Sequence, residues 1–265
     1  MTGDLESGVY SPELTRISSS VAMIRLRRVD RANAIQPEDV VQILDHFDTI
    51  EQEPKMRCLI ITGTGDVFSA GFDLKLIANV AGEGGAEFAK MVDRVESSRL
   101  FTLAGLNGPA VGGAADLALA CDMRIGVHDL HIRVPAARIG LPLYGGALRR
   151  FVARLGLSHA LSMLLGCQKL SAEALVHAGY LQRIVRRENL FEVISGLAQD
   201  IATFPPAPLA SMKQALLSLG NELSHQQQTN LAAAIDPLGI SERIQALQKN
   251  KLCKRRHGHF PDCWF

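Results

Sequence analysis

Residues 101–122 read FTLAGLNGPAVGGAADLALACD and carry the most informative local pattern in the chain. Phe101–Leu106 is a short apolar run, which predicts a strand, and the alanine-rich residues after Gly113 predict a helix. A turn of small residues, Asn107–Gly112, joins the two. The first N–H groups of a helix have no partner inside the helix, so this turn presents backbone donors to whatever lies beside it.

A second turn of this kind spans Val67–Lys75, shortly after the apolar, β-branched run Cys58–Thr62, which predicts a buried strand. Two N–H donors that point at one oxygen form an oxyanion hole, which a thioester carbonyl needs when negative charge develops on its oxygen. Small residues after a strand are also typical of tight turns and close packing. The two turns alone therefore leave both interpretations open.

The flanking segments predict an α/β fold. Val21–Leu26 alternates in polarity and predicts a half-buried strand, and Pro37 predicts the start of a helix. Between the two turns a second helix is predicted, with Phe88 and Val95 on its apolar face. Further short strands are predicted at Met123–Val127, His131–Val134 and Gln182–Val185. Strands and helices that alternate at this spacing favour a parallel sheet.

The C-terminal part predicts mainly helices. The segment Phe204-Pro205-Pro206 is the expected domain boundary, which divides the chain into a core of residues 1–204 and a helical region of residues 205–265. One helix is predicted to start at Pro208 and to end at Gly220. Its apolar residues share a single stripe: Leu209, Met212, Leu216 and Leu219.

The composition is that of a globular protein. Of 265 residues, 47% are hydrophobic and 21% are charged, and the formal net charge is +1. That balance provides no strong field for nucleic acid or for a membrane surface. We expect a cytoplasmic protein, because the N-terminus lacks a signal-peptide pattern and no stretch reaches the roughly 20 apolar residues of a membrane span. Five scattered cysteines, without a Cys-x-x-Cys pair, suggest neither disulfides nor a zinc site.

Four segments, in order and spacing, are similar to motifs of the crotonase superfamily, the enoyl-CoA hydratase/isomerase family. They are Arg31–Ala34, which resembles Arg-x-Asn-Ala; Phe68–Lys75, which resembles Phe-x-Ala-Gly-x-Asp-Leu; Gly108–Asp122, which resembles Gly-x-x-x-Gly-Gly-x-x-(Glu/Asp)-Leu-x-x-x-x-Asp; and Ser171–Tyr180. The last match is looser, because Leu175 and Tyr180 replace an alanine and a leucine of the family pattern.

The resemblance implies a fold and a set of binding residues. The fold is a spiral of ββα turns with a C-terminal helical trimerisation region, assembled as a homotrimer or homohexamer. Phe72 and Gly113 are the implied oxyanion-hole donors. Backbone at Ala70, Gly71, Asp73 and Leu74 is implied to hold the adenine end of coenzyme A. Coenzyme A enters as part of an acyl-CoA substrate, and no metal or separate cofactor is expected.

Asp116 occupies the place of one of the two carboxylates that hydratases of this family use. An acid among alanines and leucines can stabilise the helix dipole or can serve as the catalytic acid or base. The second carboxylate is missing, because Val134-Pro135-Ala136 has an alanine at that place. Tyr144 lies at or next to the place where methylmalonyl-CoA decarboxylases carry a tyrosine and where dienoyl-CoA isomerases and chlorobenzoyl-CoA dehalogenases carry an aspartate. Its phenol can donate a proton or line the pocket.

The resemblance implies an acyl-CoA enzyme that stabilises a thioester enolate, with Asp116 as the main acid or base and Tyr144 as a second candidate catalytic residue. Because Ala136 carries no proton, isomerisation or decarboxylation fits better than hydration. The alternatives are an acyl-CoA decarboxylase and a non-catalytic acyl-CoA-binding protein. A basic cluster, Lys249–Arg256, is either a solvated tail or a contact for coenzyme A phosphates.

Overall fold

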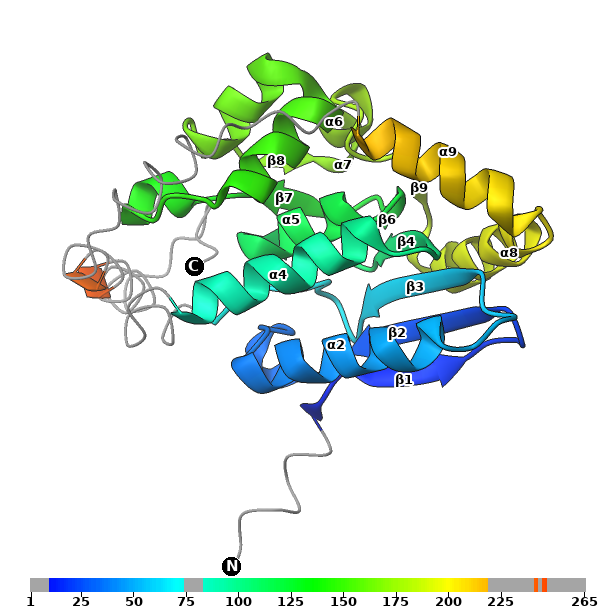
Figure 1. Cartoon of the computed structure of the whole chain (residues 1–265). Helices are drawn as coiled ribbons and strands as arrows, with labels where there is room; N and C mark the ends of the chain where they lie inside the picture. Colours follow the sequence, from blue (N-terminus) through cyan, green and yellow to red (C-terminus); the bar gives the residue numbers. More distant parts are fainter. Residues whose placement is uncertain (1–9, 74–82, 219–240, 243–244, 247–265) are drawn as a thin grey trace, which may run out of the picture.

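The computed structural model describes residues 10–73, 83–218, 241–242 and 245–246, and Figure 1 shows its course. The basic cluster Lys249–Arg256 lies outside these ranges. Within the described ranges, no helix is long and apolar enough to cross a bilayer.

Six strands form the larger sheet, in the order β1-β2-β3-β4-β6-β9. They are Glu13–Arg16, Val21–Leu26, Cys58–Gly63, Phe101–Leu106, Met123–Val127 and Arg183–Val185. β1 runs antiparallel to β2, and each later pair is parallel. Since Thr62 of β3 pairs with Gly105 of β4, these two strands end side by side. The two glycine-containing turns that follow them therefore start at the same edge of the sheet.

Three helices pack around this sheet. α2 (Pro37–Glu51) and α4 (Glu83–Ser97) contact each other and lie in front of the strands in Figure 1. α8 (Leu190–Ala202) packs across β3, β4 and β6. Phe88 and Val95 of α4 are buried, which confirms the predicted apolar face of that helix.

A second, smaller sheet has the order β5-β7-β8, with strands Ala110–Val111, His131–Arg133 and Leu170–Ser171. α5 (Gly113–Ala120) begins directly after β5, and α6 (Gly145–Leu164) and α7 (Ala172–His177) follow later in the chain. α6 bends at Gly156, where φ is +75°. The three short 3-10 helices are Val29–Arg31, Ala136–Ile139 and Arg187–Asn189.

α5 lies inside the molecule, and every residue from Ala114 to Ala120 is buried. It contacts α4, α6, β5 and β6. Arg124, at the start of β6, is buried and donates hydrogen bonds to the carbonyl oxygens of Leu119, Cys121 and Tyr180. Because the last carbonyls of a helix lack partners within it, this side chain serves as a cap for α5.

Two sequence predictions need correction. Val21–Leu26 is not half-buried: only Arg25 is partly exposed, because the strand is central and covered on both faces. α9 (Pro206–Ser218) starts two residues before the predicted Pro208, since proline is well accommodated in the first turn of a helix. Gly220, the predicted end, is outside the described residues.

α9 is attached to the core by a partly buried lysine and by Leu209, the first residue of its apolar stripe. The Lys213 ammonium donates to the carboxylate of Asp122 at 2.7 Å and to the carbonyl of Leu100 at 2.9 Å. Of the predicted stripe, Leu209 is partly buried against the core, whereas Met212 and Leu216 are 57% and 69% exposed. Leu219 lies outside the described residues. The division of the chain at residue 204 stays a prediction.

Candidate active site

The two glycine-containing turns interlock at the edge of the larger sheet. A Cβ atom on Gly71 would lie 2.5 Å from the carbonyl oxygen of Val111 and 2.9 Å from the amide nitrogen of Gly113. No side chain fits into that space, and Gly71 also has φ +84°, a conformation that favours glycine. Hydrogen bonds from Phe68 N to Pro109 O and from Val111 N to Ser69 O join the turns along their length.

Phe72 and Gly113 place their amide groups beside each other at this junction. A Cβ on Gly113 would lie 3.6 Å from the Phe72 nitrogen. Among the described residues, neither amide has a recorded hydrogen-bond acceptor. Gly113 is the first residue of α5, where an N–H has no intrahelical partner. The predicted pair of oxyanion-hole donors is therefore brought together with both N–H groups available to a ligand.

Aromatic rings line this junction. The Phe88 ring on α4 covers Gly113, because a Cβ there would be 2.8 Å from two ring carbons. The Phe72 and Phe88 ring centroids are 5.5 Å apart with an interplanar angle of 55°. Both residues are buried. The surroundings of the two donors are thus apolar, which strengthens the interaction of an N–H with a negative oxygen.

Asp116 lies one helical turn after Gly113, and both of its carboxylate oxygens are occupied. Arg150 of α6 donates from Nε to Oδ1 and from Nη2 to Oδ2, each at 2.9 Å. The Tyr144 hydroxyl donates to Oδ2, and its oxygen accepts from Arg150 Nη2 at 3.2 Å. The structure therefore brings the two predicted catalytic side chains into contact, together with an arginine that the sequence patterns did not indicate.

The opposite edge of the Arg150 guanidinium faces α4. Nη1 donates to Asp93 at 2.7 Å and to Glu96 at 2.9 Å. Arg149 and Arg154 also pair with Glu96. Three cations thus meet three carboxylates between α4, α5 and α6, and the side chain of Arg150 is wholly buried among them.

The buried setting shifts the ionisation of this cluster. Burial, and after it the charge of Asp116, raises the pKa of Tyr144 well above 10, so the phenol keeps its proton at neutral pH. Burial opposes the charge on Arg150, but its hydrogen-bonded carboxylate Asp116 outweighs burial, and the net pKa is raised. The pKa of Glu96 is lowered overall: burial raises it, but the positive charges of Arg150 and Arg149 outweigh burial.

Ala136, at the place of the missing carboxylate, is buried at the start of the 3-10 helix Ala136–Ile139. Its methyl group can neither accept nor donate a proton. Tyr144, immediately before α6, is partly exposed and is the proton-bearing side chain in contact with Asp116.

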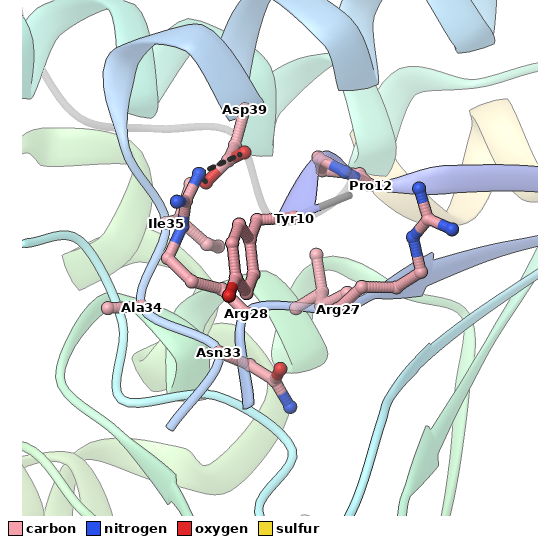
Figure 2. A pocket seen from close by; sticks show the side chains of 9 residues that line it. Tyr10, Pro12, Arg27, Arg28, Asn33, Ala34, Ile35 and Asp39 are labelled. Carbon is pink, nitrogen blue, oxygen red and sulfur yellow. Dashed lines mark hydrogen bonds and ion pairs between the residues drawn. The ribbon is translucent and has the colours of Figure 1, made fainter. Parts of the chain in front are cut away.

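Figure 2 shows the side chains that line a small hollow. One of its lining residues, Ile35, exchanges backbone hydrogen bonds with Gly71 and Asp73, which belong to the predicted adenine-binding backbone. Ala70 N donates to Ala32 O and Asp73 N donates to Ile35 O, so these amides are used within the chain. Gly71 N donates to the Ser69 hydroxyl. The hollow is lined by Tyr10, Pro12, Leu26, Arg27, Arg28, Asn33, Ala34, Ile35 and Asp39. Leu74 lies outside the described residues.

The residues that the sequence patterns missed are Arg150, its α4 partners Asp93 and Glu96, and Phe88 as a neighbour of Gly113. A signal was present in the spacing of Arg150 and Arg154 on one helix and of Asp93 and Glu96 on another. Residues three or four apart share a helix face, so the two sets can meet if the helices pack together.

The family model described as enoyl-CoA hydratase/isomerase matches residues 16–243. The chain belongs to this family. Its sequence is 31% identical over 213 residues to a Thermus thermophilus protein provisionally named enoyl-CoA hydratase, covering 75% of this chain and 81% of the relative. It is 30% identical over 189 residues to the carnitinyl-CoA dehydratase of Salmonella typhimurium, covering 69% of this chain and 72% of the relative.

Solved structures show the same crotonase fold. An enoyl-CoA hydratase/isomerase from Xanthobacter autotrophicus superposes with a TM-score of 0.79 at 24% identity. The superposition covers 95% of the chain described here and 99% of the Xanthobacter chain. An enoyl-CoA hydratase from Bacillus anthracis gives 0.74 at 24% identity, with 91% and 96% covered. The predicted superfamily and the α/β fold class are confirmed.

Proposed function

We propose that this enoyl-CoA hydratase/isomerase family member binds an acyl-CoA thioester and stabilises its enolate with the N–H groups of Phe72 and Gly113. The observation that carries the proposal is the pair of amides at the junction of the two turns, neither of which has a hydrogen-bond acceptor within the described ranges. A thioester oxygen placed between them accepts two hydrogen bonds in an apolar, preorganised site, where such donors act most strongly.

Tyr144 is the proton donor in this proposal. Asp116 is a poor free base, because Arg150 and Tyr144 already occupy both carboxylate oxygens. Tyr144 keeps its proton, and rotation of the O–H bond about the Cζ–O axis turns that proton from Asp116 toward a substrate carbon. Arg150 Nη2 then continues to donate to the phenol oxygen as it gains negative charge.

Decarboxylation of a 2-carboxyacyl thioester needs only these groups. The bond between the α-carbon and the carboxylate breaks, carbon dioxide leaves, and the electron pair moves into the enolate held by the Phe72 and Gly113 amides. The Tyr144 hydroxyl gives its proton to the α-carbon, and solvent returns a proton to the phenolate. No base is required at any point, which suits a site where Asp116 is occupied.

The reactions named for the relatives place heavier demands on the site. The names of the T. thermophilus and Salmonella relatives refer to hydration and dehydration. Hydration requires a group that takes a proton from water, and dehydration requires a group that protonates the leaving hydroxyl. Ala136 can do neither, and Asp116 would first have to leave Arg150. Isomerisation requires removal of a proton from carbon, so it too depends on Asp116.

A second candidate is an acyl-CoA-binding protein without turnover. The full occupation of Asp116 and the alanine at position 136 favour it, since both reduce the number of groups free to move protons. In either case we propose that backbone at Ala70, Gly71, Asp73 and Leu74 meets the adenine end of coenzyme A. We further propose a cytoplasmic homotrimer or homohexamer with no metal or separate cofactor.

Calorimetry followed by turnover assays tests these proposals. Acetyl-CoA and butanoyl-CoA should show saturable binding, and its absence would remove both candidates. Turnover is then measured with methylmalonyl-CoA, a 3-enoyl-CoA and crotonyl-CoA. Loss of carbon dioxide from methylmalonyl-CoA at a higher rate than crotonyl-CoA hydration supports decarboxylation. Rapid hydration would instead show that another group replaces Ala136, and binding with no turnover would support the binding protein.

A further inference from the structure

The guanidinium of Arg150 contacts both the candidate active site and the ion cluster on α4. Two functions are therefore open to it: positioning a catalytic group, or balancing buried charge. Towards the site it donates to both oxygens of Asp116 and to the Tyr144 hydroxyl. Towards α4 it donates to Asp93 and Glu96. The side chain is wholly buried, so it is held in this one arrangement by its neighbours.

We propose that Arg150 is a positioning residue for the proton transfer, acting through Asp116 and Tyr144; this inference rests on the proposed function. Its two parallel hydrogen bonds fix the plane of the Asp116 carboxylate. Oδ2 of that carboxylate then accepts from the Tyr144 hydroxyl, so the direction of the phenol is set by the arginine. A planar guanidinium can hold a carboxylate in this two-point manner, whereas a lysine ammonium cannot.

The partners of the neighbouring arginines distinguish this function from simple charge balance. Glu96 pairs with Arg149 and Arg154 as well as with Arg150, so it keeps two cations if Arg150 is removed. Among the described residues, Asp116 has no ion pair other than that with Arg150. Among the described residues Asp93 also pairs with Arg150 alone, but its side chain is 53% exposed and can be solvated, whereas that of Asp116 is 5% exposed. The buried carboxylate that depends on Arg150 alone is therefore Asp116, on the side of the cluster that faces the site.

Arg149→Met is the matched control for Arg150→Met. The two arginines are adjacent on α6 and both bond to Glu96, but only Arg150 reaches Asp116. With the fastest substrate of the methylmalonyl-CoA, 3-enoyl-CoA and crotonyl-CoA panel, we expect Arg150→Met to lose about 10²-fold in kcat, the lower range for a misplaced proton donor. Butanoyl-CoA should bind Arg150→Met within about twofold of the wild type, since the amide donors are untouched. Arg150→Lys should recover little of the loss.

A double variant covers the case in which Arg150→Met does not fold. Asp116→Asn with Arg150→Met removes the anion and the cation together, so no uncompensated charge is left buried. Arg150 also makes one direct hydrogen bond, from Nη2 to the Tyr144 hydroxyl at 3.2 Å, which the double variant loses and Asp116→Asn keeps. If Arg150 acts mainly through Asp116, the double variant should be no more than about tenfold slower than Asp116→Asn alone, well short of the product of the two single losses, because residues that act as a unit are not additive.

Three results would overturn the inference. Equal kcat for Arg150→Met and Arg149→Met would make Arg150 a structural cation only. Multiplied losses in the double variant would show that it acts independently of Asp116. Failure of the wild-type protein to turn over any substrate of the panel would overturn the proposed enzymatic function, and this inference with it. That failure is distinguishable from the other two results, because the wild-type protein is assayed before any variant is made.

Discussion

Two arginine–tyrosine pairs pack against α5, and they hold it through different acceptors. The site pair, Tyr144 with Arg150, contacts the carboxylate of Asp116. The second pair, Tyr180 with Arg124, contacts backbone carbonyls: the Tyr180 hydroxyl donates to Ala115 O at 2.6 Å, and Arg124 caps the end of the helix. In each pair the guanidinium carbon lies close to the partner ring, at 5.8 and 5.7 Å from its centroid.

The difference shows how the acceptor determines what a buried cation does. Burial, and after it the charge of Arg154, lowers the pKa of Arg124 to about 10, and its hydrogen-bond acceptors are neutral carbonyls. The carboxylate of Asp116 instead raises the pKa of Arg150 despite burial. A cation held by carbonyls completes the backbone hydrogen bonding of the fold. A cation held by a carboxylate at the site fixes a group that can take part in chemistry. The following predictions test this distinction.

The largest effect is expected from the two tyrosines. Tyr144→Phe should reduce kcat by about 10²–10⁴, equivalent to roughly 3–5 kcal/mol of barrier, because it removes the proposed proton donor. Tyr180→Phe is the matched control; it should leave kcat unchanged and lower the free energy of unfolding by about 0.5–1.5 kcal/mol, for one lost hydrogen bond. Steady-state kinetics and urea unfolding measure both. Similar kinetic losses in the two variants would erase the distinction between the pairs.

The two arginines should differ in stability. Arg150→Met leaves Asp116 buried without its cation and should lower the free energy of unfolding by about 3–5 kcal/mol. Arg124→Met leaves carbonyls without a donor but creates no unpaired charge, so about 1–3 kcal/mol is expected. Urea midpoints at pH 7 give both values. A larger loss for Arg124→Met would mean that capping α5 outweighs charge pairing in this core.

These pairs also mark how far the sequence could predict the molecule. Strands at Val21–Leu26 and Phe101–Leu106 were predicted at their observed bounds, because long apolar runs bounded by turns are local signals. The turns around Gly71 and Gly113 were identified by motif, and the Phe72 and Gly113 amides lie beside each other in the structure. Their role as oxyanion-hole donors stays a prediction. The catalytic assignment of Asp116 and Tyr144 remains a prediction.

Arg150 could not be predicted in the same way. It is 34 residues from Asp116, and its contact depends on how α6 is rotated against α5. The stripe of Met212 and Leu216 illustrates the opposite error. Its spacing correctly predicts a helix, but a periodic pattern does not say which surface, if any, covers it, and both residues are exposed here.

A smaller effect is expected from the thiol at the end of α5 that Arg124 caps. Burial raises the pKa of Cys121 to about 12, so the folded protein keeps a proton that the unfolded chain loses above about pH 8.5. Stability from this group is complete below about pH 8.5 and declines as the pH rises toward 12. Between pH 8 and pH 10 the free energy of unfolding should therefore fall in both proteins. The fall should be about 1–2 kcal/mol larger in the wild type than in Cys121→Ala. Equal losses would indicate that this end of α5 is open to water.

The smallest effect is expected at Phe88, whose ring lies against the start of α5, at the candidate site. Phe88→Leu removes the ring that covers Gly113 and opens space near the acyl group. We expect the ratio of dissociation constants for acetyl-CoA and hexanoyl-CoA to shift by about tenfold toward the longer chain, or ~1.4 kcal/mol, the scale of one or two methylenes in an apolar pocket. Phe47→Leu, on the buried face of α2, is the control and should leave that ratio unchanged.

The junction at Gly71 has a consequence for how this protein can change over generations. Because the two amide donors are spaced by backbone packed on backbone, replacing the side chain at position 72 leaves the donor itself in place. Under the proposed function, side chains such as Tyr144 and Phe88 can then vary without moving the two amides that we propose receive the negative charge. New reactions are thus accessible through single substitutions around a constant centre, while a substitution at Gly71 itself closes every such route at once.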